Sequence, residues 1–247
     1  MIFSHGQDIR EGRITRQSIR VVFFDVGSTL IYPDPSIAEV FVSTAKSLGY
    51  DVSLREVESH MPALGEFYER EYARDGDFWC SHSRAVEIWL DMYRLLAREC
   101  GLTEGIERLA EKTHEGYLDA RNWALYGDVL ATLKGLKRRG FRLGIISNWD
   151  TNLESLLRDV NLLPYFDEVI ASAAVGYRKP NPEIFKIACE RMEVNPEKAI
   201  HVGDHPDADG DGAYGAGLVP VIIDRKNRFD ACPYIRINVL SDLVSMI

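Results

Sequence analysis

The chain has 247 residues, of which 46% are hydrophobic and 27% are charged, and its formal net charge is −9 at pH 7. This length allows one large domain or a core with a modest insert, and the composition is that of an ordinary globular protein. The negative charge argues against nucleic acid and anionic membranes as partners, and no apolar run approaches the roughly 20 residues that span a bilayer.

The N-terminal segment, residues 1–18, is predicted to be a polar extension. Residues 1–10 lack the apolar region of a signal peptide, so we expect a cytoplasmic protein. The cysteines are scattered and form no Cys-x-x-Cys pair; they are Cys80, Cys100, Cys189 and Cys232. Such a distribution is typical of reduced, mostly buried thiols and argues against metal binding by cysteine.

The first predicted strand is the run of apolar, β-branched and aromatic residues that begins at Ile19 and ends at Asp25. A short continuous run of this kind is typical of a strand that is buried on both faces of a parallel sheet. The turn-rich sequence Pro33-Asp-Pro35 then leads the chain away from the strand. We therefore expect a core strand followed by a change of architecture.

Residues 33–126 interrupt the alternation of strands and helices that marks the rest of the chain. Within them, apolar residues at alternating spacings of three and four predict an amphipathic helix that ends at Gly101; they are Val86, Trp89, Tyr93, Leu96 and Cys100. We interpret residues 33–126 as a helical cap that is inserted into a core formed by residues 19–32 and 127–247.

The remaining chain alternates between helical patterns and short apolar runs. Helices are predicted at Asp128–Arg139, after a capping box at Thr151–Glu154, and at Pro182–Arg191. Strands are predicted at Phe141–Ile146, Glu168–Ala171, Ala199–Val202 and Pro220–Ile223. This alternation predicts an α/β fold with a doubly wound, Rossmann-like parallel sheet. The basic residues near the end of the first helix are interpreted as a solvated surface; they are Lys134, Lys137, Arg138 and Arg139.

Polar residues follow several of these predicted strands. They are Asp25, Ser147, Asn148, Lys179, Gly203 and Asp204. Ligands of open α/β sheets bind at the carboxyl ends of the strands, so we expect these groups to converge on one edge. Two carboxylates, a hydroxyl, an amide and an ammonium group suit an anionic substrate that is bound together with a divalent cation.

Four segments of the chain, in order, resemble the signature motifs of the haloacid dehalogenase superfamily. They are Asp25-Val-Gly-Ser-Thr-Leu30, Ile145-Ile-Ser-Asn148, Gly176-Tyr-Arg-Lys-Pro180, and His201-Val-Gly-Asp204 with the following Asp209. The resemblance covers about residues 19–30 and 129–221, whereas the cap matches only in general character. It implies a hydrolase that acts on a small phosphorylated substrate, with Mg²⁺ as its cofactor. Nothing in the sequence indicates the oligomeric state.

The resemblance also implies a role for each motif residue. Asp25 would attack phosphorus and form an aspartyl-phosphate. Ser147 and Asn148 would bind the substrate, and Lys179 would neutralise charge on the nucleophile and on the transferred group. The Mg²⁺ ligands would be Asp25, the carbonyl of Gly27 and Asp204, with Asp209 either coordinating the ion or orienting its ligands.

Gly27 departs from the phosphatase pattern, in which a second aspartate two residues after the nucleophile serves as acid and base. Three interpretations stay open. In the first, another acid replaces the aspartate, with candidates at His60, Glu66, Asp75, His82 and His205. Alternatively, the leaving group needs no proton, as in an acyl phosphate, a phosphonate or a halide. Finally, the chain could be a catalytically weak phosphate-binding protein.

Particular residues bear on these alternatives. The Gly203-Asp204 metal motif is intact, whereas haloacid dehalogenases lack it. A phosphonatase would need a cap lysine, for which Lys46 and Lys112 are the only candidates in the cap sequence. The sequence Gly210–Gly215 matches the dinucleotide-binding pattern GxGxxG, but an acidic loop separates it from the preceding strand, which disfavours an oxidoreductase.

Overall fold

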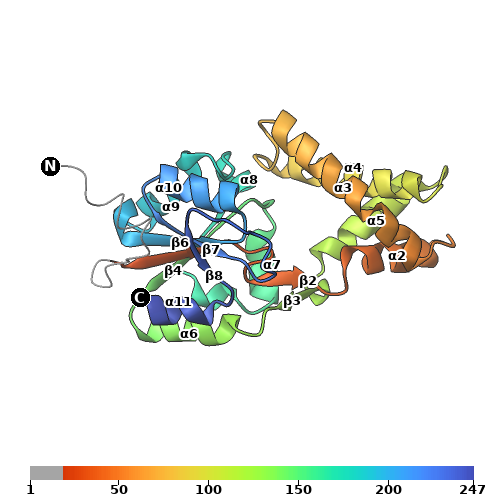
Figure 1. The fold of residues 1–247 in the computed structure, drawn as a ribbon. Helices are drawn as coiled ribbons and strands as arrows, with labels where there is room; N and C mark the ends of the chain where they lie inside the picture. The colour runs from red at the N-terminus through yellow and green to blue at the C-terminus, as the bar shows by residue number, and fades with distance from the viewer. Residues whose placement is uncertain (1–18) are drawn as a thin grey trace.

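The core of the protein is a six-stranded sheet in the order β5-β4-β1-β6-β7-β8, as seen in the computed structural model, which describes residues 19–247 (Figure 1). Its strands are β1 (Val21–Phe24), β4 (Arg142–Ser147), β5 (Glu168–Ala171), β6 (Ala199–Gly203), β7 (Val219–Ile223) and β8 (Ile235–Ile237). All neighbouring strands are parallel. The predicted polar extension, residues 1–18, lies outside the described residues.

Helices cover both faces of this sheet. They are α6 (Val129–Arg138), α7 (Leu153–Asp159), α8 (Ser172–Val175), α9 (Pro182–Arg191), α10 (Gly212–Gly215) and α11 (Ser241–Met246). Successive residues of β1 belong to two different apolar clusters: Val22 packs with residues of α6, α7 and α11, and Val21 packs with residues of α9 and α10. Because side chains alternate between the faces of a strand, each face has its own core. The predicted doubly wound α/β fold is confirmed.

A second group of helices stands beside the carboxyl edge of the sheet (Figure 1). It comprises α2 (Ile37–Ser47), α3 (Leu54–Arg74), α4 (His82–Glu99) and α5 (Ile106–Leu118). The chain enters and leaves it through β2 (Ile31–Pro33) and β3 (Trp123–Leu125), which pair antiparallel. The predicted amphipathic helix is α4, which buries Ile88, Trp89 and Leu96. The inserted helical cap is thus confirmed, while its limits at residues 33 and 126 stay a prediction.

The predicted capping box at Thr151–Glu154 is wrong. Helix α7 begins after Asn152, and no side chain caps it. Buried Asp150 accepts a hydrogen bond from the Asn152 backbone over 2.7 Å, and the Thr151 hydroxyl lies 3.0 Å from Nδ1 of His82 in α4. The threonine therefore contacts the cap, because the neighbouring helix offers its side chain a partner that a sequence pattern cannot reveal.

None of the helices in residues 19–247 combines the length and the apolar character needed to cross a bilayer. The basic residues at the end of α6 have partners at the surface of the core: Lys137 pairs with Asp167 over 3.1 Å, and Arg139 donates to the carbonyl of Ile247 over 2.8 Å. Both contacts are typical of a solvated helix end.

Candidate active site

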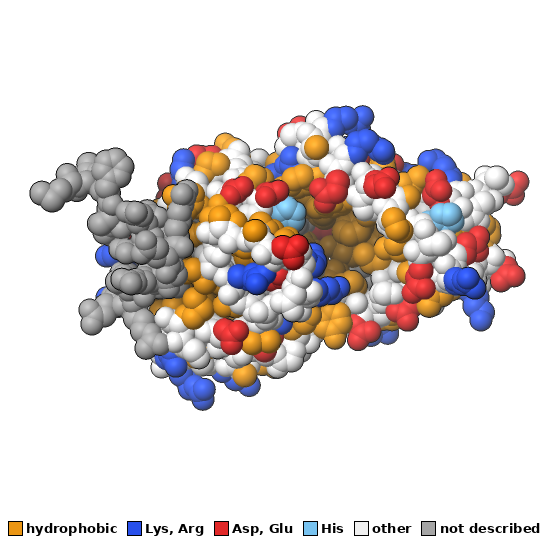
Figure 2. Space-filling view, in the orientation of Figure 1, with side chains coloured by type: hydrophobic (Ala, Val, Ile, Leu, Met, Phe, Trp, Pro, Cys, Tyr) orange, Lys and Arg blue, Asp and Glu red, His pale blue; other side chains and the backbone are white. Residues whose placement is uncertain are grey.

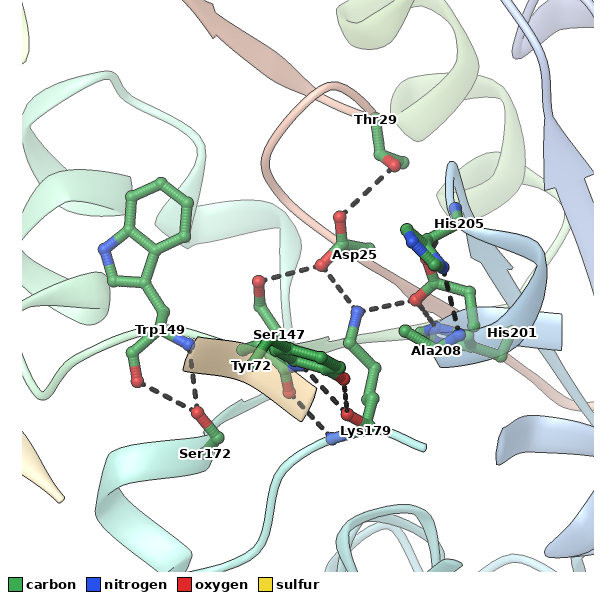
Figure 3. Close-up of polar contacts among 12 residues, drawn as sticks. Asp25, Thr29, Tyr72, Ser147, Trp149, Ser172, Lys179, His201, His205 and Ala208 are labelled. Atoms are coloured by element: carbon green, nitrogen blue, oxygen red, sulfur yellow. Dashed lines mark hydrogen bonds and ion pairs between the residues drawn. The ribbon is translucent and has the colours of Figure 1, made fainter. Parts of the chain in front are cut away.

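Asp25 lies at the carboxyl end of the central strand, where its backbone N–H donates to the carbonyl of Val202 over 2.8 Å. Its side chain is buried, and the two carboxylate oxygens have different partners. Oδ1 accepts from the Ser147 hydroxyl at 2.8 Å and from the Lys179 ammonium at 2.7 Å. Oδ2 accepts only a long contact from Thr29, at 3.4 Å, among the described residues (Figure 3). Oδ2 is therefore the less engaged oxygen.

Lys179 links two carboxylates in the interior. It is 2% exposed, and its ammonium group donates to Asp25 at 2.7 Å and to Asp209 at 2.6 Å. Burial by itself would lower its pKa, but the charges of Asp209 and Asp25 outweigh burial and raise the pKa above its usual range. Lys179 is therefore a permanent cation at this edge of the sheet.

Asp209 is held from three sides in a π-helical turn, η4 (Pro206–Asp211). Oδ1 accepts from Lys179 and from Nε2 of His201, the latter over 2.8 Å, and Oδ2 accepts from the His205 backbone over 3.0 Å. Burial opposes ionisation of Asp209, but the charge of Lys179 and the hydrogen bond from His201 prevail and hold its pKa well below its usual range. Both carboxylate oxygens of Asp209 already accept hydrogen bonds. Of the two expected roles, this arrangement favours orientation of Lys179 over coordination of a metal ion.

Asp204 completes a cluster with Asp25 and Asp209 in which ligand oxygens lie within 4.8 Å of one another. Burial, together with the charges of the other two carboxylates, raises the pKa of Asp204 to about 6, although Arg228 donates to its Oδ2 over 3.0 Å. Burial is the largest cause of this rise, and the charges of Asp25 and Asp209 add to it more than Arg228 offsets. Hard carboxylate oxygens with excess negative charge suit Mg²⁺, so the residues present fit this ion.

The main chain of Lys179 is held by residues from two different parts of the molecule. The Asn148 amide accepts from the Lys179 N–H at 2.7 Å and donates to its carbonyl at 3.1 Å. The Tyr72 hydroxyl of cap helix α3 donates to the same carbonyl at 2.6 Å, and the Arg178 guanidinium lies 3.8 Å from the Tyr72 ring centre. Asn148 thus positions Lys179, and a direct contact between this amide and a substrate stays a prediction.

A cavity of about 560 Å³ lies between the core and the cap, above Asp25. The space-filling view shows a hollow between these two parts, with hydrophobic side chains in its depth (Figure 2). Gly27 lines the cavity, as do Trp149 of the core and a group of α3 residues: Tyr68, Glu69, Tyr72 and Ala73. The cap therefore supplies one wall of the candidate active site.

Of the residues expected to replace the missing acid, His205 lines this cavity. The others contact different groups in the described part of the chain or lie at its surface: His60 is near Glu99, Asp75 pairs with Arg84, His82 contacts Thr151, and Glu66 is exposed. Glu69, which sequence reasoning did not single out, also lines the cavity. Glu69 is next to Tyr68 in the sequence, but only the packing of the cap shows which face of α3 is turned to the core.

Two glycines of the Gly210–Gly215 segment, Gly210 and Gly212, serve packing within the core, whereas a Cβ on Gly215 would meet open space. A Cβ on Gly210 would lie 2.4 Å from the Tyr234 ring, and one on Gly212 would lie 2.9 Å from the Cα of Pro180. Real Cβ atoms do not approach other atoms so closely, so these positions need glycine for contact with neighbouring segments. Two of the three glycines that match the dinucleotide-binding pattern are therefore explained by packing.

Comparison with known proteins gives phosphatase and dehalogenase relatives. A glyceraldehyde 3-phosphate phosphatase of Methanopyrus kandleri is 33% identical, over 87% of this chain and 88% of that protein. The structure of a HAD phosphatase from Thermococcus onnurineus covers 92% of this chain and 97% of its own, at 27% identity and a TM-score of 0.63. A 2-haloacid dehalogenase from Pseudomonas syringae has the same coverage, 26% identity and a TM-score of 0.62.

The family model of the haloacid dehalogenase-like hydrolases matches residues 19–217, which include all four motifs and the cap. The resemblance expected from the four motifs is confirmed, and the match also includes the cap, for which only a general likeness was expected. The enzymatic character of the relatives agrees with a buried site that holds three carboxylates and a lysine. The chain belongs to the haloacid dehalogenase-like hydrolase family.

Proposed function

We propose that this protein hydrolyses a small phosphorylated compound in the presence of Mg²⁺, through an aspartyl-phosphate on Asp25. The observation that carries the proposal is the ion pair between Asp25 and Lys179, together with the close approach of the Asp25, Asp204 and Asp209 carboxylates, whose ligand oxygens lie within 4.8 Å of one another. The phosphatases among the relatives support the same activity. We also propose that the protein is cytoplasmic and that its partner is a small phosphorylated metabolite.

In the first step, Oδ2 of Asp25 attacks phosphorus, an Oδ2–P bond forms, and the bond from phosphorus to the leaving oxygen breaks. Ser147 and Lys179 hold Oδ1, so that the carboxylate turns its less engaged oxygen to the substrate. Water then attacks phosphorus, releases inorganic phosphate and restores the carboxylate. Mg²⁺, held by Asp25, Asp204 and the carbonyl of Gly27, would screen the repulsion between carboxylate and phosphate.

Lys179 contributes charge throughout this sequence. It stays protonated because Asp209 and Asp25 raise its pKa, and it can therefore neutralise the transferred phosphoryl group. Asp209 is proposed to act through Lys179, because its oxygens are already engaged by the lysine, by His201 and by the backbone of His205.

The alternatives differ in the leaving group. For a phosphonatase, support is weak, because neither Lys46 nor Lys112 lines the cavity and Lys112 pairs with Glu115 over 2.6 Å. A halide substrate accords with the dehalogenase relative, but the position of Asp204 beside Asp25 favours chemistry with a metal ion. An acyl phosphate agrees with Gly27, which has no side chain to protonate a leaving group.

The deciding experiment is a panel of phosphate esters, acyl phosphates, phosphonates and haloacids, with and without Mg²⁺, on the wild type and on Asp25→Asn. We expect turnover of phosphorylated compounds that depends on both Mg²⁺ and Asp25. Equal activity of Asp25→Asn would eliminate the mechanism. Absence of all turnover, together with beryllofluoride binding that requires Asp25, would instead indicate a phosphate-binding protein.

A further inference from the structure

The space beside Gly27 is bordered by an aromatic ring. A Cβ on this glycine would lie 3.5 Å from Cζ3 of Trp149, an ordinary van der Waals contact. The Trp149 ring is itself held in place by stacking on Tyr117 and by a tilted contact with Trp123. Its side chain is buried, so the indole is part of the fixed wall of the site. The position two residues after the nucleophile therefore offers an incoming leaving group an apolar surface.

The hydroxyl groups at the cavity are poorly suited to donate a proton. Tyr72 donates its hydroxyl hydrogen to the Lys179 carbonyl over 2.6 Å. Tyr68 accepts from the Trp79 indole over 2.9 Å, and burial raises the pKa of Tyr68 to about 12, so that it is a weaker acid than an ordinary phenol. General acid catalysis works best when the acid has a pKa near the operating pH. These tyrosines are therefore poor proton donors.

The same tyrosines give the cavity an aromatic wall on the side of the cap. Tyr68 and Tyr72 are stacked, with ring centres 6.1 Å apart and an interplanar angle of 16°. Tyr68 also packs edge-on against Phe78 at 5.0 Å, which fixes its orientation. Aromatic side chains favour aromatic partners by about 0.5–1.5 kcal/mol beyond the burial of apolar area. A planar ring on the substrate would find such partners on both sides, from the cap tyrosines and from Trp149.

We propose that the substrate is an aryl phosphate, a phosphate monoester of a phenol, whose ring lies between Trp149 and the tyrosines Tyr68 and Tyr72. This inference rests on the proposed function, and it names the substrate class of the same site. The absence of an acid at position 27 and the aromatic walls have one common explanation. The leaving group departs as an anion, and its ring is what the cavity recognises.

The chemistry of the leaving group supports this combination. The conjugate acid of a phenolate has a pKa of about 10, as in tyrosine. An aliphatic alkoxide is nearly as basic as hydroxide, and the pKa of water is about 15.7. When Oδ2 of Asp25 forms its bond to phosphorus, the P–O bond electrons leave with the phenolate, which takes its proton from solvent after release. Water then cleaves the aspartyl-phosphate, and its proton also passes to solvent.

Four small substrates test the two parts of the proposal separately, with Mg²⁺ present. Phenyl phosphate and benzyl phosphate share an aromatic ring, but only phenyl phosphate has an acidic leaving group. Acetyl phosphate and ethyl phosphate differ in the same way and have no ring. We expect kcat/KM for phenyl phosphate to exceed that for benzyl phosphate by about 10²–10⁴-fold, the usual contribution of a general acid. We expect KM for phenyl phosphate to be lower than for acetyl phosphate.

Two variants refine the test. Gly27→Asp should raise turnover of benzyl phosphate more than that of phenyl phosphate, because the position has room for a Cβ and the new acid helps the basic leaving group most. Tyr68→Leu should raise KM for phenyl phosphate more than it raises KM for acetyl phosphate, and Tyr68→Phe, which keeps the ring, should raise the ratio of the two KM values less than Tyr68→Leu does. The wild-type comparison decides the question even if a variant does not fold.

Each contrary result has a distinct meaning. Equal kcat/KM for benzyl and phenyl phosphate in the wild type would overturn the proposal, since another group, such as Glu69 or His205, would then protonate the leaving group. Equal KM values for phenyl and acetyl phosphate would overturn recognition of the ring. If none of the four compounds shows turnover that depends on Asp25 while other phosphorylated compounds of the wider panel do, this inference fails alone. If no compound of that panel is turned over, the proposed hydrolase function fails, and this inference with it.

Discussion

Replacement of Lys179 by methionine should destabilise the protein strongly at neutral pH. The lysine side chain is 3% exposed, and it pairs with Asp25 and Asp209, whose side chains are 10% and 2% exposed. Methionine is unbranched and of similar length, so most of the packing is kept while the charge is lost. Two carboxylates then remain in the interior without their common cation.

The magnitude follows from this burial. Removing one partner of a buried ion pair costs about 3–5 kcal/mol, because the remaining charge is left without compensation. In the wild type, the pKa of Asp209 is lower in the folded protein than in the unfolded chain. Its contribution to stability is therefore fully present above about pH 3.9, the pKa of an unfolded aspartate, and is lost as the pH falls through the pKa of the folded protein. Without Lys179, burial raises the pKa of Asp209, and protonation at low pH relieves the penalty. The difference between the two proteins should therefore be largest near neutral pH and should shrink in acid.

The assay is urea denaturation of both proteins at several pH values, with EDTA present so that no divalent cation replaces the lost charge. Lys137→Met is the matched control, because Lys137 pairs with Asp167 over 3.1 Å at the surface, with side chains 37% and 38% exposed. Such a pair contributes about 0–1 kcal/mol. A Lys179→Met protein as stable as the wild type at pH 7 would refute the claim that this lysine compensates the buried carboxylates.

Three further predictions concern other parts of the site and core. Tyr72→Phe removes one hydrogen bond to the Lys179 carbonyl, so stability in urea should fall by about 0.5–1.5 kcal/mol, and kcat for an aryl phosphate should fall as well because Lys179 is held less firmly; unchanged stability would contradict this. Since Asp204 has a pKa of about 6 and metal ligands must be deprotonated, Mg²⁺ affinity measured by calorimetry should fall below that pH; an affinity independent of pH would contradict this. Gly144→Ala places a Cβ 2.7 Å from the Phe23 ring and should cost about 1–3 kcal/mol in urea unfolding, whereas Gly135→Ala, with ordinary contacts at 3.7 Å, should cost nothing.

Much of the fold could be predicted from local patterns. The strand that ends at Asp25 is a continuous apolar run because both of its faces are buried, and the later strands follow the same rule. The short strands β2 and β3 were missed, since three residues each carry little periodic signal. The Thr151 capping box failed because a sequence pattern does not include the competing partners that Asp150 and His82 provide.

Part of the site was also accessible to sequence reasoning. Parallel strands bring their carboxyl ends to one edge, so Asp25, Ser147 and Asp204 could be expected together before any distance was known. Lys179 was expected with them, and the structure brings it within 2.7 Å of Asp25. The order of the four motifs thus indicated the charged centre of the site.

The sequence by itself determined the α/β core and the charged groups at its edge, because strand periodicity and strand ends are properties of neighbouring residues. Only the tertiary structure decided what surrounds those groups. Tyr72 reaches Lys179 from 107 positions away in the chain, and the ring of Trp149 borders Gly27. Such contacts depend on how the cap packs against the core, and no local pattern encodes them. The charged centre is therefore visible in the sequence, whereas the aromatic cavity that would select the substrate exists only in the folded protein.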